Sequence, residues 1–300
     1  MQSLRKIIKK IYIKIFFIFE KLGIHITYNY YYSPIPNIHK LDKNIFSKKY
    51  ELIGVNVNDN FQNNMIDIFV SNFKSEYENI PENRIENIQR FYYKNEMFSN
   101  IDAEVLYSFV RYFKPKNIIE IGSGFSTLLI SESLEKNKYE NPNYECNHVS
   151  IEPYPRDFLK KGVSSLKKLI TKNVQEIDLN FFNILSENDI LFIDSSHVVK
   201  IGSDVCYEIL EILPRLNKGV IIHFHDIFLP AEYSKNYIID NLFFWNEQYL
   251  LHAFLTFNDC FEVIWGSNYM HIKYPEKLEK AFSKYKGKGA GGSLWIRKIK

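Results

Sequence analysis

The chain has 300 residues, of which 46% are hydrophobic and 24% are charged, and its formal net charge is +3. This length allows one large α/β domain with a core of ordinary size, and the hydrophobic content argues against disorder. The charge is uneven, since residues 1–26 carry six Lys or Arg against one Glu and the remainder sums to about −2. The body of the chain therefore lacks a basic nucleic-acid-binding surface, and no nucleic-acid partner is expected.

Three cysteines, Cys146, Cys206 and Cys260, lie far apart and form no CxxC or Cys/His spacing. Neither a disulfide framework nor a structural zinc site is indicated. A reducing environment suits this usage, and the cytoplasm is the expected location.

Residues 1–26, MQSLRKIIKKIYIKIFFIFEKLGIHI, have the pattern of a basic amphipathic helix. Lys14 interrupts the apolar stretch, which is shorter than the roughly 20 residues of a spanning helix, and no small-residue cleavage site follows. We therefore expect neither a transmembrane span nor a signal peptide. Two interpretations stay open: peripheral contact with an anionic membrane, or packing on the domain.

The next segment, TYNYYYSPIPN, contains Pro34 and Pro36, which favour extended backbone and end any helix. Helical patterns follow in NMIDIFVSNF and in IDAEVLYSFVRYF, where Asp102 is a candidate N-cap. We expect three parts: an amphipathic helix over 1–26, a helical and extended region over 27–100, and an α/β domain over 101–300.

From residue 117 onward, short apolar runs alternate with helical patterns. They read NIIEI, STLLISESLEK, HVSIE, RDFLKKGVSSL, LITKNV, DILFID, SDVCYEILEIL and GVIIHFHD. This alternation predicts an α/β class, doubly wound parallel sheet with helices on both faces. A helix in NLFFWNEQYLLHAFLTF, a strand in FEVIWG and, after the turn GKGAGG, a last strand in SLWIRKI complete the predicted domain.

A glycine turn follows the first predicted strand and opens a helix. Gly122 and Gly124 would let the backbone approach a ligand closely, and the helix start offers N–H donors. A dinucleotide fingerprint requires a third glycine where this chain has Thr127, so a nicotinamide or flavin cofactor is disfavoured. Glu152 ends the second strand and could accept both hydroxyls of a ribose. We favour a site for an adenosine-type ligand. The alternative is that the glycines only form a tight turn and that Glu152 is a solvent-exposed strand end.

Two later strands end in aspartates with histidines beside them. DILFID ends in Asp194 and is followed by His197, whereas GVIIHFHD contains His223 and His225 and ends in Asp226. As neighbouring parallel strands, about 4.8 Å apart, they would bring the two aspartates together. Such carboxylates repel each other unless a cation or a shared proton intervenes, and oxygen ligands suit magnesium. We interpret His223 as a core residue, or as one that supports a ligand from behind, and His225 as a third candidate ligand.

His197 is the candidate general base, because an imidazole near neutral pKa can remove a hydroxyl proton. The alternative is that His197 has only a structural role, as a loop histidine that caps local structure. A hydrolase or oxygenase centre built from His223, His225 and Asp226 is a second hypothesis, although strand neighbours point to opposite faces. A third is a non-catalytic, nucleotide-binding peripheral protein, which would need residues 1–26 but not His197.

The motif Glu120-Ile-Gly122-Ser123-Gly124 with a downstream Glu152 resembles class I S-adenosylmethionine-dependent methyltransferases. The resemblance implies that Glu120 lies near the methionine amino group, that the glycine turn brackets methionine and ribose, and that Glu152 takes the ribose hydroxyls. The full set of cofactor residues that it implies is Glu120, Gly122, Ser123, Gly124, Glu152, Val174, Gln175 and Asp194, with Val174 and Gln175 beside the adenine.

The pattern Asp-x-x-His with a later His-Asp resembles the metal-dependent sugar O-methyltransferase branch of that superfamily. YYSPIPN, FWNEQYLLHAFL and GGSLWIRK resemble the wider methyltransferase-24-like group. The resemblance implies magnesium at Asp194 and Asp226, proton removal by His197, and a small-molecule or glycan acceptor methylated on a hydroxyl. That branch has an acidic residue where this chain has His225, which leaves open a weaker metal site, a softer ion, or no ion with His225 as an acid or base.

Overall fold

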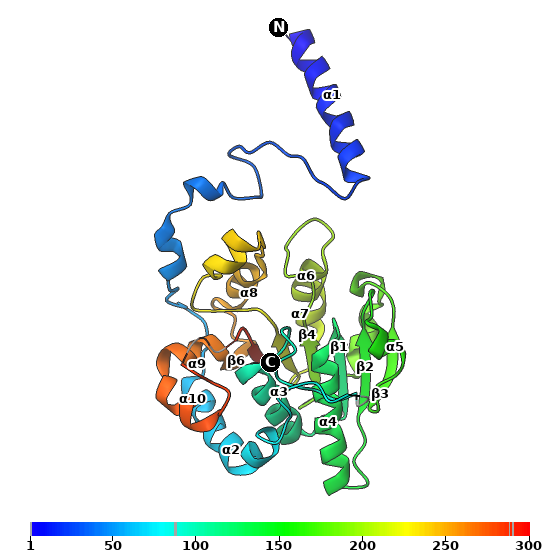
Figure 1. Ribbon diagram of the computed structural model, residues 1–300, viewed down its shortest axis with the longest axis vertical. Helices are drawn as coiled ribbons and strands as arrows, with labels where there is room; N and C mark the ends of the chain where they lie inside the picture. Colours follow the sequence, from blue (N-terminus) through cyan, green and yellow to red (C-terminus); the bar gives the residue numbers. More distant parts are fainter. Residues whose placement is uncertain (1, 87–88, 288, 290) are drawn as a thin grey trace. The chain divides into compact units, whose positions relative to one another are not determined.

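The computed structural model describes residues 2–86, 89–287, 289 and 291–300 (Figure 1). The chain forms two compact units. The first comprises the chain up to Phe46 together with Ser234–Phe244, and the second comprises Ser47–Tyr233 together with Trp245–Lys300. All residues predicted for catalysis or cofactor binding belong to the second unit.

The second unit is built on a sheet that has seven strands in the described part of the chain, in the order β3-β2-β1-β4-β5-β7-β6. The strands are β1 (Asn117–Ile121), β2 (Asn147–Ile151), β3 (Leu166–Ile170), β4 (Ile190–Ile193), β5 (Ile221–Phe224), β6 (Phe261–Gly266) and β7 (Leu294–Lys298). The first five pair in parallel, while β7 is antiparallel to both β5 and β6. The predicted doubly wound α/β class is confirmed.

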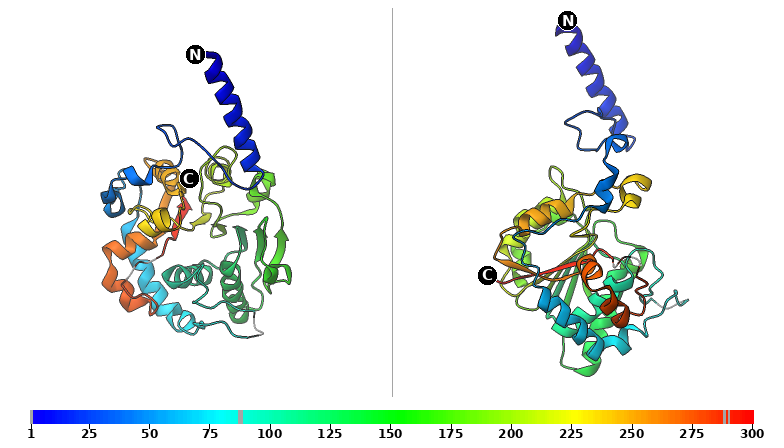
Figure 2. Two further views of the ribbon diagram at one scale, coloured as in Figure 1. Left: turned by 45° about the horizontal axis from the view of Figure 1, so that its top comes forward. Right: turned by 90° about the vertical axis from the view of Figure 1, so that its left-hand side faces the viewer.

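The central strands are apolar along their whole length because both of their faces are buried. Ile118 and Phe192 belong to one core layer, whereas their sequence neighbours Ile119 and Leu191 belong to the other. The right-hand view of Figure 2 shows helices on both faces of the sheet. The sheet edge, rather than either face, is therefore where the strands can present side chains to a ligand.

The helices are divided between the two faces. One core layer includes side chains of α2 (Asp59–Tyr77), α3 (Asn100–Phe113), α4 (Phe125–Glu140), the short α5 (Asp157–Lys160), α9 (Ser267–Lys273) and α10 (Pro275–Ala281). The other includes α6 (Asp204–Tyr207), α7 (Leu213–Arg215), the π-helical turn Glu208–Ile212 between them, and α8 (Glu247–Leu255).

Three local predictions differ from the structure. Strand β3 ends at Ile170, and Val174–Glu176 is a 3-10 turn rather than the end of that strand. Because β3 is an edge strand, it keeps two exposed lysines that obscure its apolar pattern. Helix α8 begins at Glu247 instead of residue 241, and Ser99, not Asp102, is the N-cap of α3.

Some predicted features fall on residues outside the described part. Lys288 and Ala290 of the predicted glycine-rich turn are among them, as are Met1 and residues 87–88 of the two N-terminal regions.

The first unit contains the long helix α1 (Gln2–Glu20), the 3-10 turn Ile38–Lys40 and the π-helical turn Asn236–Asp240; a further 3-10 turn, Lys43–Ser47, spans its boundary. Among the described residues, no helix combines the length and the apolar character needed to cross a bilayer.

A carboxylic acid lies inside the helical layer of the second unit. Glu104, in α3, has no solvent-exposed surface, and neither of its oxygens has a hydrogen-bond partner. Burial raises the pKa of Glu104 to about 8, although nearby Lys284 opposes the shift. The side chain is therefore protonated in the folded protein at neutral pH.

This buried acid predicts a pH-dependent stability. The unfolded chain ionises Glu104 near its ordinary pKa of 4.5, whereas the folded chain does so only near pH 8. The unfolded state thus binds fewer protons in this window, and the free energy of unfolding should fall as pH rises through it, by up to about 5 kcal/mol. Urea denaturation followed by circular dichroism at pH 5, 7 and 9 measures this. Glu104→Gln should remove that part of the slope, whereas the exposed Glu135→Gln should not; equal slopes in all three proteins would contradict the assignment.

Candidate functional site

Three parallel strands bring the predicted residues to one edge of the sheet. Ile121 of β1 pairs with Ile193 of β4, which in turn pairs with Phe224 of β5. The next residues therefore continue the same row, and the Asp194 N–H donates to Ile121 O at 2.8 Å while the His225 N–H donates to Ile193 O at 3.0 Å. The glycine turn and both Asp/His clusters meet at this carboxyl edge, as the sequence predicts.

The two glycines of the turn meet different constraints. Gly122 has a φ of +81°, and a Cβ added there would lie 1.9 Å from the backbone oxygen of Asp194, so no other residue fits. A Cβ at Gly124 would meet no atom within 4 Å. Gly122 is therefore required by the protein itself, whereas Gly124 leaves open space beside the turn.

The backbone donors of the turn already have protein acceptors. The Ser123 N–H donates to Glu152 Oε2 at 3.1 Å, and the Gly124 N–H donates to Thr127 Oγ1 at 3.1 Å. The Tyr154 N–H fixes the other Glu152 oxygen at 2.7 Å. A pyrophosphate would need these turn donors free, so the arrangement disfavours a dinucleotide. It holds the Glu152 carboxylate in a set position, with lone pairs left for a ligand hydroxyl.

A cavity of about 410 Å³ opens at this edge. Five of the eight predicted cofactor residues line it: Gly122, Glu152, Val174, Gln175 and Asp194. Its volume is in the range of small-molecule and cofactor sites. The structure thus brings the glycine turn, the acidic strand end and the predicted adenine neighbours around one space.

Glu120 lies elsewhere, although it belongs to the motif that suggested the site. It is completely buried; its Oε2 contacts His148 Nε2 at 2.9 Å, and its Oε1 accepts from Ser126 Oγ at 3.1 Å. Both oxygens are thus engaged in the core, and Glu120 does not line the cavity. Contact between Glu120 and a cofactor stays a prediction.

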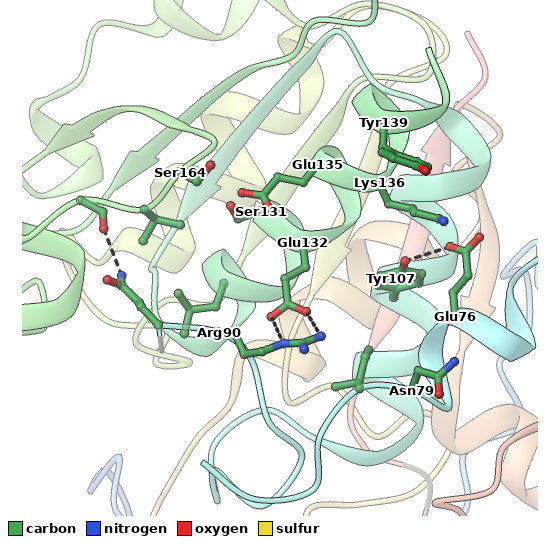
Figure 3. A pocket seen from close by; sticks show the side chains of 15 residues that line it. Glu76, Asn79, Arg90, Tyr107, Ser131, Glu132, Glu135, Lys136, Tyr139 and Ser164 are labelled. Atoms are coloured by element: carbon green, nitrogen blue, oxygen red, sulfur yellow. Dashed lines mark hydrogen bonds and ion pairs between the residues drawn. The ribbon is translucent and has the colours of Figure 1, made fainter. Parts of the chain in front are cut away.

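A larger cavity, of about 770 Å³, is lined by none of the predicted site residues. Figure 3 shows its polar side chains contacting one another: Arg90 forms an ion pair with Glu132 at 3.0 Å, and the Tyr107 hydroxyl donates to Glu76 at 2.8 Å. These contacts engage four of its polar side chains with one another, and the cavity lies away from the glycine turn and both Asp/His clusters. The smaller cavity at the sheet edge is therefore the candidate site.

His197 lies among carboxylates next to this cavity. Its Nδ1 is 2.9 Å from Glu247 Oε2, and its Nε2 is 3.4 Å from Asp194 Oδ1 and 3.7 Å from Asp226 Oδ2. The loop that carries it is tied to the start of α8, since His197 O accepts from the backbone N–H groups of Asn246 and Glu247. These contacts fix the ring orientation, with Nε2 toward the two aspartates.

His225 occupies the space between the two aspartates. Its Nδ1 is 3.5 Å from Asp194 Oδ1 and 3.5 Å from Asp226 Oδ2, and its Nε2 is 3.9 Å from Asp102 Oδ2. Asp102 in turn accepts hydrogen bonds from the backbone N–H groups of Gly292 and Ser293, at 2.8 and 3.1 Å. The two aspartates are thus bridged by an imidazole that a third carboxylate supports.

Charges in this cluster stabilise one another despite burial. Burial lowers the pKa of His197, but hydrogen bonds to Asp194 and Glu247 outweigh it and raise the value to about 10. Burial lowers the pKa of His225 too, but Asp226 and Asp194 raise it well above its usual range. Burial raises the pKa of both aspartates, yet the imidazoles hold each below its ordinary value. At neutral pH, both histidines carry a proton and both aspartates are ionised.

The predicted metal site does not find support in this geometry. In the part of the chain that the structure describes, no group of three or more His, Cys, Asp or Glu side chains is arranged to hold a metal ion. The imidazole of His225 lies where an ion bridging Asp194 and Asp226 would have to bind. The residues present therefore fit a protonated imidazole between two carboxylates, rather than magnesium with His225 as a third ligand.

His223 is a core residue, as interpreted from the sequence. Its ring stacks on Phe192 with centroids 4.0 Å apart, its Nε2 is 2.9 Å from Ser293 Oγ, and burial lowers its pKa well below the ordinary value. It therefore does not join His225 and Asp226 in the iron centre of the oxygenase hypothesis.

Two residues of the site had no sequence motif to reveal them. Glu247 is the single acidic residue in the apolar segment FFWNEQYLLHAFL, which is a weak signal of a buried partner. Asp102 had the appearance of a helix cap, and its partners lie about 190 residues away in sequence. Only the folded chain brings these carboxylates to the two histidines.

Part of the chain is similar in sequence to known proteins. The family model described as "Methyltransferase domain" matches residues 119–227. An uncharacterised protein of Archaeoglobus fulgidus is 34% identical over 167 residues, which are 53% of this chain and 73% of that protein.

Two solved structures are similar at low identity. One is a putative protein-L-isoaspartate O-methyltransferase from Plasmodium falciparum with S-adenosyl-L-homocysteine, at 12% identity and a TM-score of 0.31, over 59% of this chain and 86% of that one. The other is the plantazolicin methyltransferase in complex with a triazolic desmethylPZN analog and S-adenosylhomocysteine, at 14% identity and a TM-score of 0.38, over 80% of this chain and 97% of that one. At these scores neither bears on the site.

The contact between Glu247 and His197 yields a prediction. Glu247→Gln keeps the side-chain shape but removes a negative charge, so the pKa of His197 should fall by about one pH unit or more. Titration of the imidazole by NMR measures it. Glu208→Gln is the matched control, because Glu208 is buried nearby but hydrogen-bonded to Ser195 Oγ, and its effect should be smaller. An unchanged pKa in Glu247→Gln would contradict the role given to this pair.

Proposed function

We propose that this chain, whose residues 119–227 match a methyltransferase domain, is a class I S-adenosylmethionine-dependent methyltransferase that methylates a hydroxyl group of a sugar or glycan precursor. The acceptor class and the residue roles below are our proposal. The observation that carries it is His197, held by Glu247 on one nitrogen and facing Asp194, a residue of the cofactor cavity, on the other.

The cavity suits the cofactor in size and in polar groups. Glu152, fixed by two backbone donors, would accept the ribose hydroxyls, and a ligand could use the open space beside Gly124. Val174 and Gln175 would flank the adenine. When bound, S-adenosylmethionine supplies a methyl group on a positively charged sulfur, which an oxygen nucleophile can attack directly.

His197 would act as the general base. The hydrogen bond to Glu247 keeps a proton on Nδ1, so Nε2 is the nitrogen that releases and accepts protons. In its neutral form, Nε2 can take the proton of an acceptor hydroxyl held beside Asp194. Since the carboxylates favour the charged imidazole, the reaction should be faster at alkaline pH, where more of the enzyme carries neutral His197.

The surroundings of His197 favour a hydroxyl-rich acceptor. Asp194 and Asp226 are ionised acceptors that can bind hydroxyl donors, and several such contacts suit a sugar better than an apolar alcohol. The half-buried indole of Trp245 lies 4.6 Å from the His197 ring and offers an aromatic surface beside the proposed acceptor position. We assign no step to a metal ion, because the His225 ring already lies between the two aspartates.

Acceptor preference and the base can be tested together. With S-adenosylmethionine, the protein should release S-adenosylhomocysteine in the presence of nucleotide sugars or oligosaccharides, but not with carboxylate acceptors. His197→Ala should lower kcat/KM by about 10²-fold to 10⁴-fold. It should leave the affinity for S-adenosylhomocysteine, measured by calorimetry, nearly unchanged, because His197 does not line the cofactor cavity. Absence of cofactor binding in the unmodified protein would refute the whole proposal, whereas preferential carboxylate methylation would refute only the acceptor class.

Metal removal gives a second prediction. Protein dialysed against a chelator should retain its methyltransferase rate, and added magnesium should not raise it, because His225 lies between the expected ligands. Elemental analysis of the dialysed protein would verify that no divalent ion remains. If the rate were lost on chelation and restored by magnesium, Asp194 and Asp226 would be metal ligands after all.

A further inference from the structure

Helix α1 of the first unit carries an uncovered apolar face. Five isoleucines recur at spacings of three and four residues, which places them on one side of the helix. This isoleucine stripe consists of Ile7, Ile8, Ile11, Ile15 and Ile18, with exposed fractions of 51, 52, 52, 39 and 60%. The sequence pattern and the exposure together identify an apolar surface that the unit itself does not bury.

Basic residues border the isoleucine stripe on both sides. At 100° per residue, Lys10 and Lys14 fall along one edge of the stripe, whereas Arg5 and Lys9 fall along the other and beyond it. Glu20, at the end of the helix, is the single acid in α1 and lies 3.7 Å from His25. The helix thus combines an apolar face with positive flanks, and long basic side chains can extend from such flanks toward anionic groups.

The segment that follows α1 covers a different side of it. Tyr12 stacks on Tyr28 at 4.3 Å, and Phe16 stacks on His25 at 5.5 Å. Beyond these contacts, Tyr31 is 92% exposed and its neighbour Tyr32 is 78% exposed. Tyrosine rings are common at the boundary between lipid and water, because one end of the side chain is apolar and the other is polar.

We propose that α1 lies flat on an anionic phospholipid surface, with the isoleucine stripe among the acyl chains and the basic residues at the lipid phosphates. Charge complementarity favours this partner over a second copy of the helix. Stripe-to-stripe pairing of two copies would bring their basic borders together, and like charges at such borders disfavour pairing. An anionic surface neutralises the same borders and accepts the apolar face.

Flotation of the full chain with lipid vesicles tests the proposal. The chain should bind phosphatidylcholine vesicles that contain about 30 mol% phosphatidylglycerol, but bind pure phosphatidylcholine at least about tenfold more weakly. Binding should also weaken in about 0.5 M salt, because salt screens the lysines and the lipid phosphates.

Ile11→Asp and Ile13→Asp form a matched pair. The two positions lie two residues apart and are 52% and 41% exposed, but Ile13 faces away from the isoleucine stripe. Ile11→Asp should reduce vesicle binding about tenfold or more, whereas Ile13→Asp should change it less than about threefold. Binding of S-adenosylhomocysteine should remain in both variants, which shows that the second unit is folded.

Three results would overturn the assignment. The full chain could stay in the soluble fraction in the presence of anionic vesicles, or the Ile11→Asp and Ile13→Asp variants could lose vesicle binding equally. In the remaining result, the chain dimerises in sedimentation velocity without binding vesicles, and Ile11→Asp abolishes the dimer. That result would assign the isoleucine stripe to a second copy of the chain. Because the readout is lipid binding, any of these results would leave the proposed methyltransferase reaction unaffected.

Discussion

Charge neutralisation at the carboxyl edge of the sheet is the constraint on which the site depends. Parallel pairing of β4 with β5 brings Asp194 and Asp226 together at a half-buried edge, where the two carboxylates repel each other unless positive groups lie beside them. His225 and His197 supply this charge from two directions. The contacts that stabilise the two aspartates therefore also position the proposed base, His197, and raise its pKa. A substitution in this cluster should change both the stability of the edge and the protonation of His197.

The sequence predicted the fold and the site best where a residue type is required by the backbone geometry or by burial. Alternating apolar runs and helices predicted the doubly wound sheet, because parallel strands buried on both faces must be apolar throughout. The glycine turn was recognisable from its place between a strand and a helix, and the absence of a third glycine pointed away from dinucleotides; the structure shows that Gly122 is required by its closeness to Asp194 O. The closeness of Asp194 and Asp226 followed from the expected pairing of two sequential parallel strands, and His197 was expected to reach the same pocket from the loop after Asp194.

The rest depended on tertiary contacts that leave little trace in sequence. Glu247 and Asp102 reach the histidines from α8 and α3, and neither has a motif of its own. The position of His225 between the aspartates depends on register and rotamer, so a metal was a reasonable expectation until the ring was seen to fill that space. The predicted bounds of edge strand β3 were wrong because its lysines face solvent, where an apolar pattern is not required.

Strand β7 lies between β5 and β6, although it follows both in the chain. The turn before it delivers Gly292, whose N–H donates to Asp102 and whose carbonyl accepts from Ile227 beside Asp226. During synthesis, β6 therefore emerges with no strand to pair with, and β5 keeps an open edge until β7 has been made. The carboxylate of Asp102, which supports His225, therefore receives its Gly292 and Ser293 donors only after the last strand has been made.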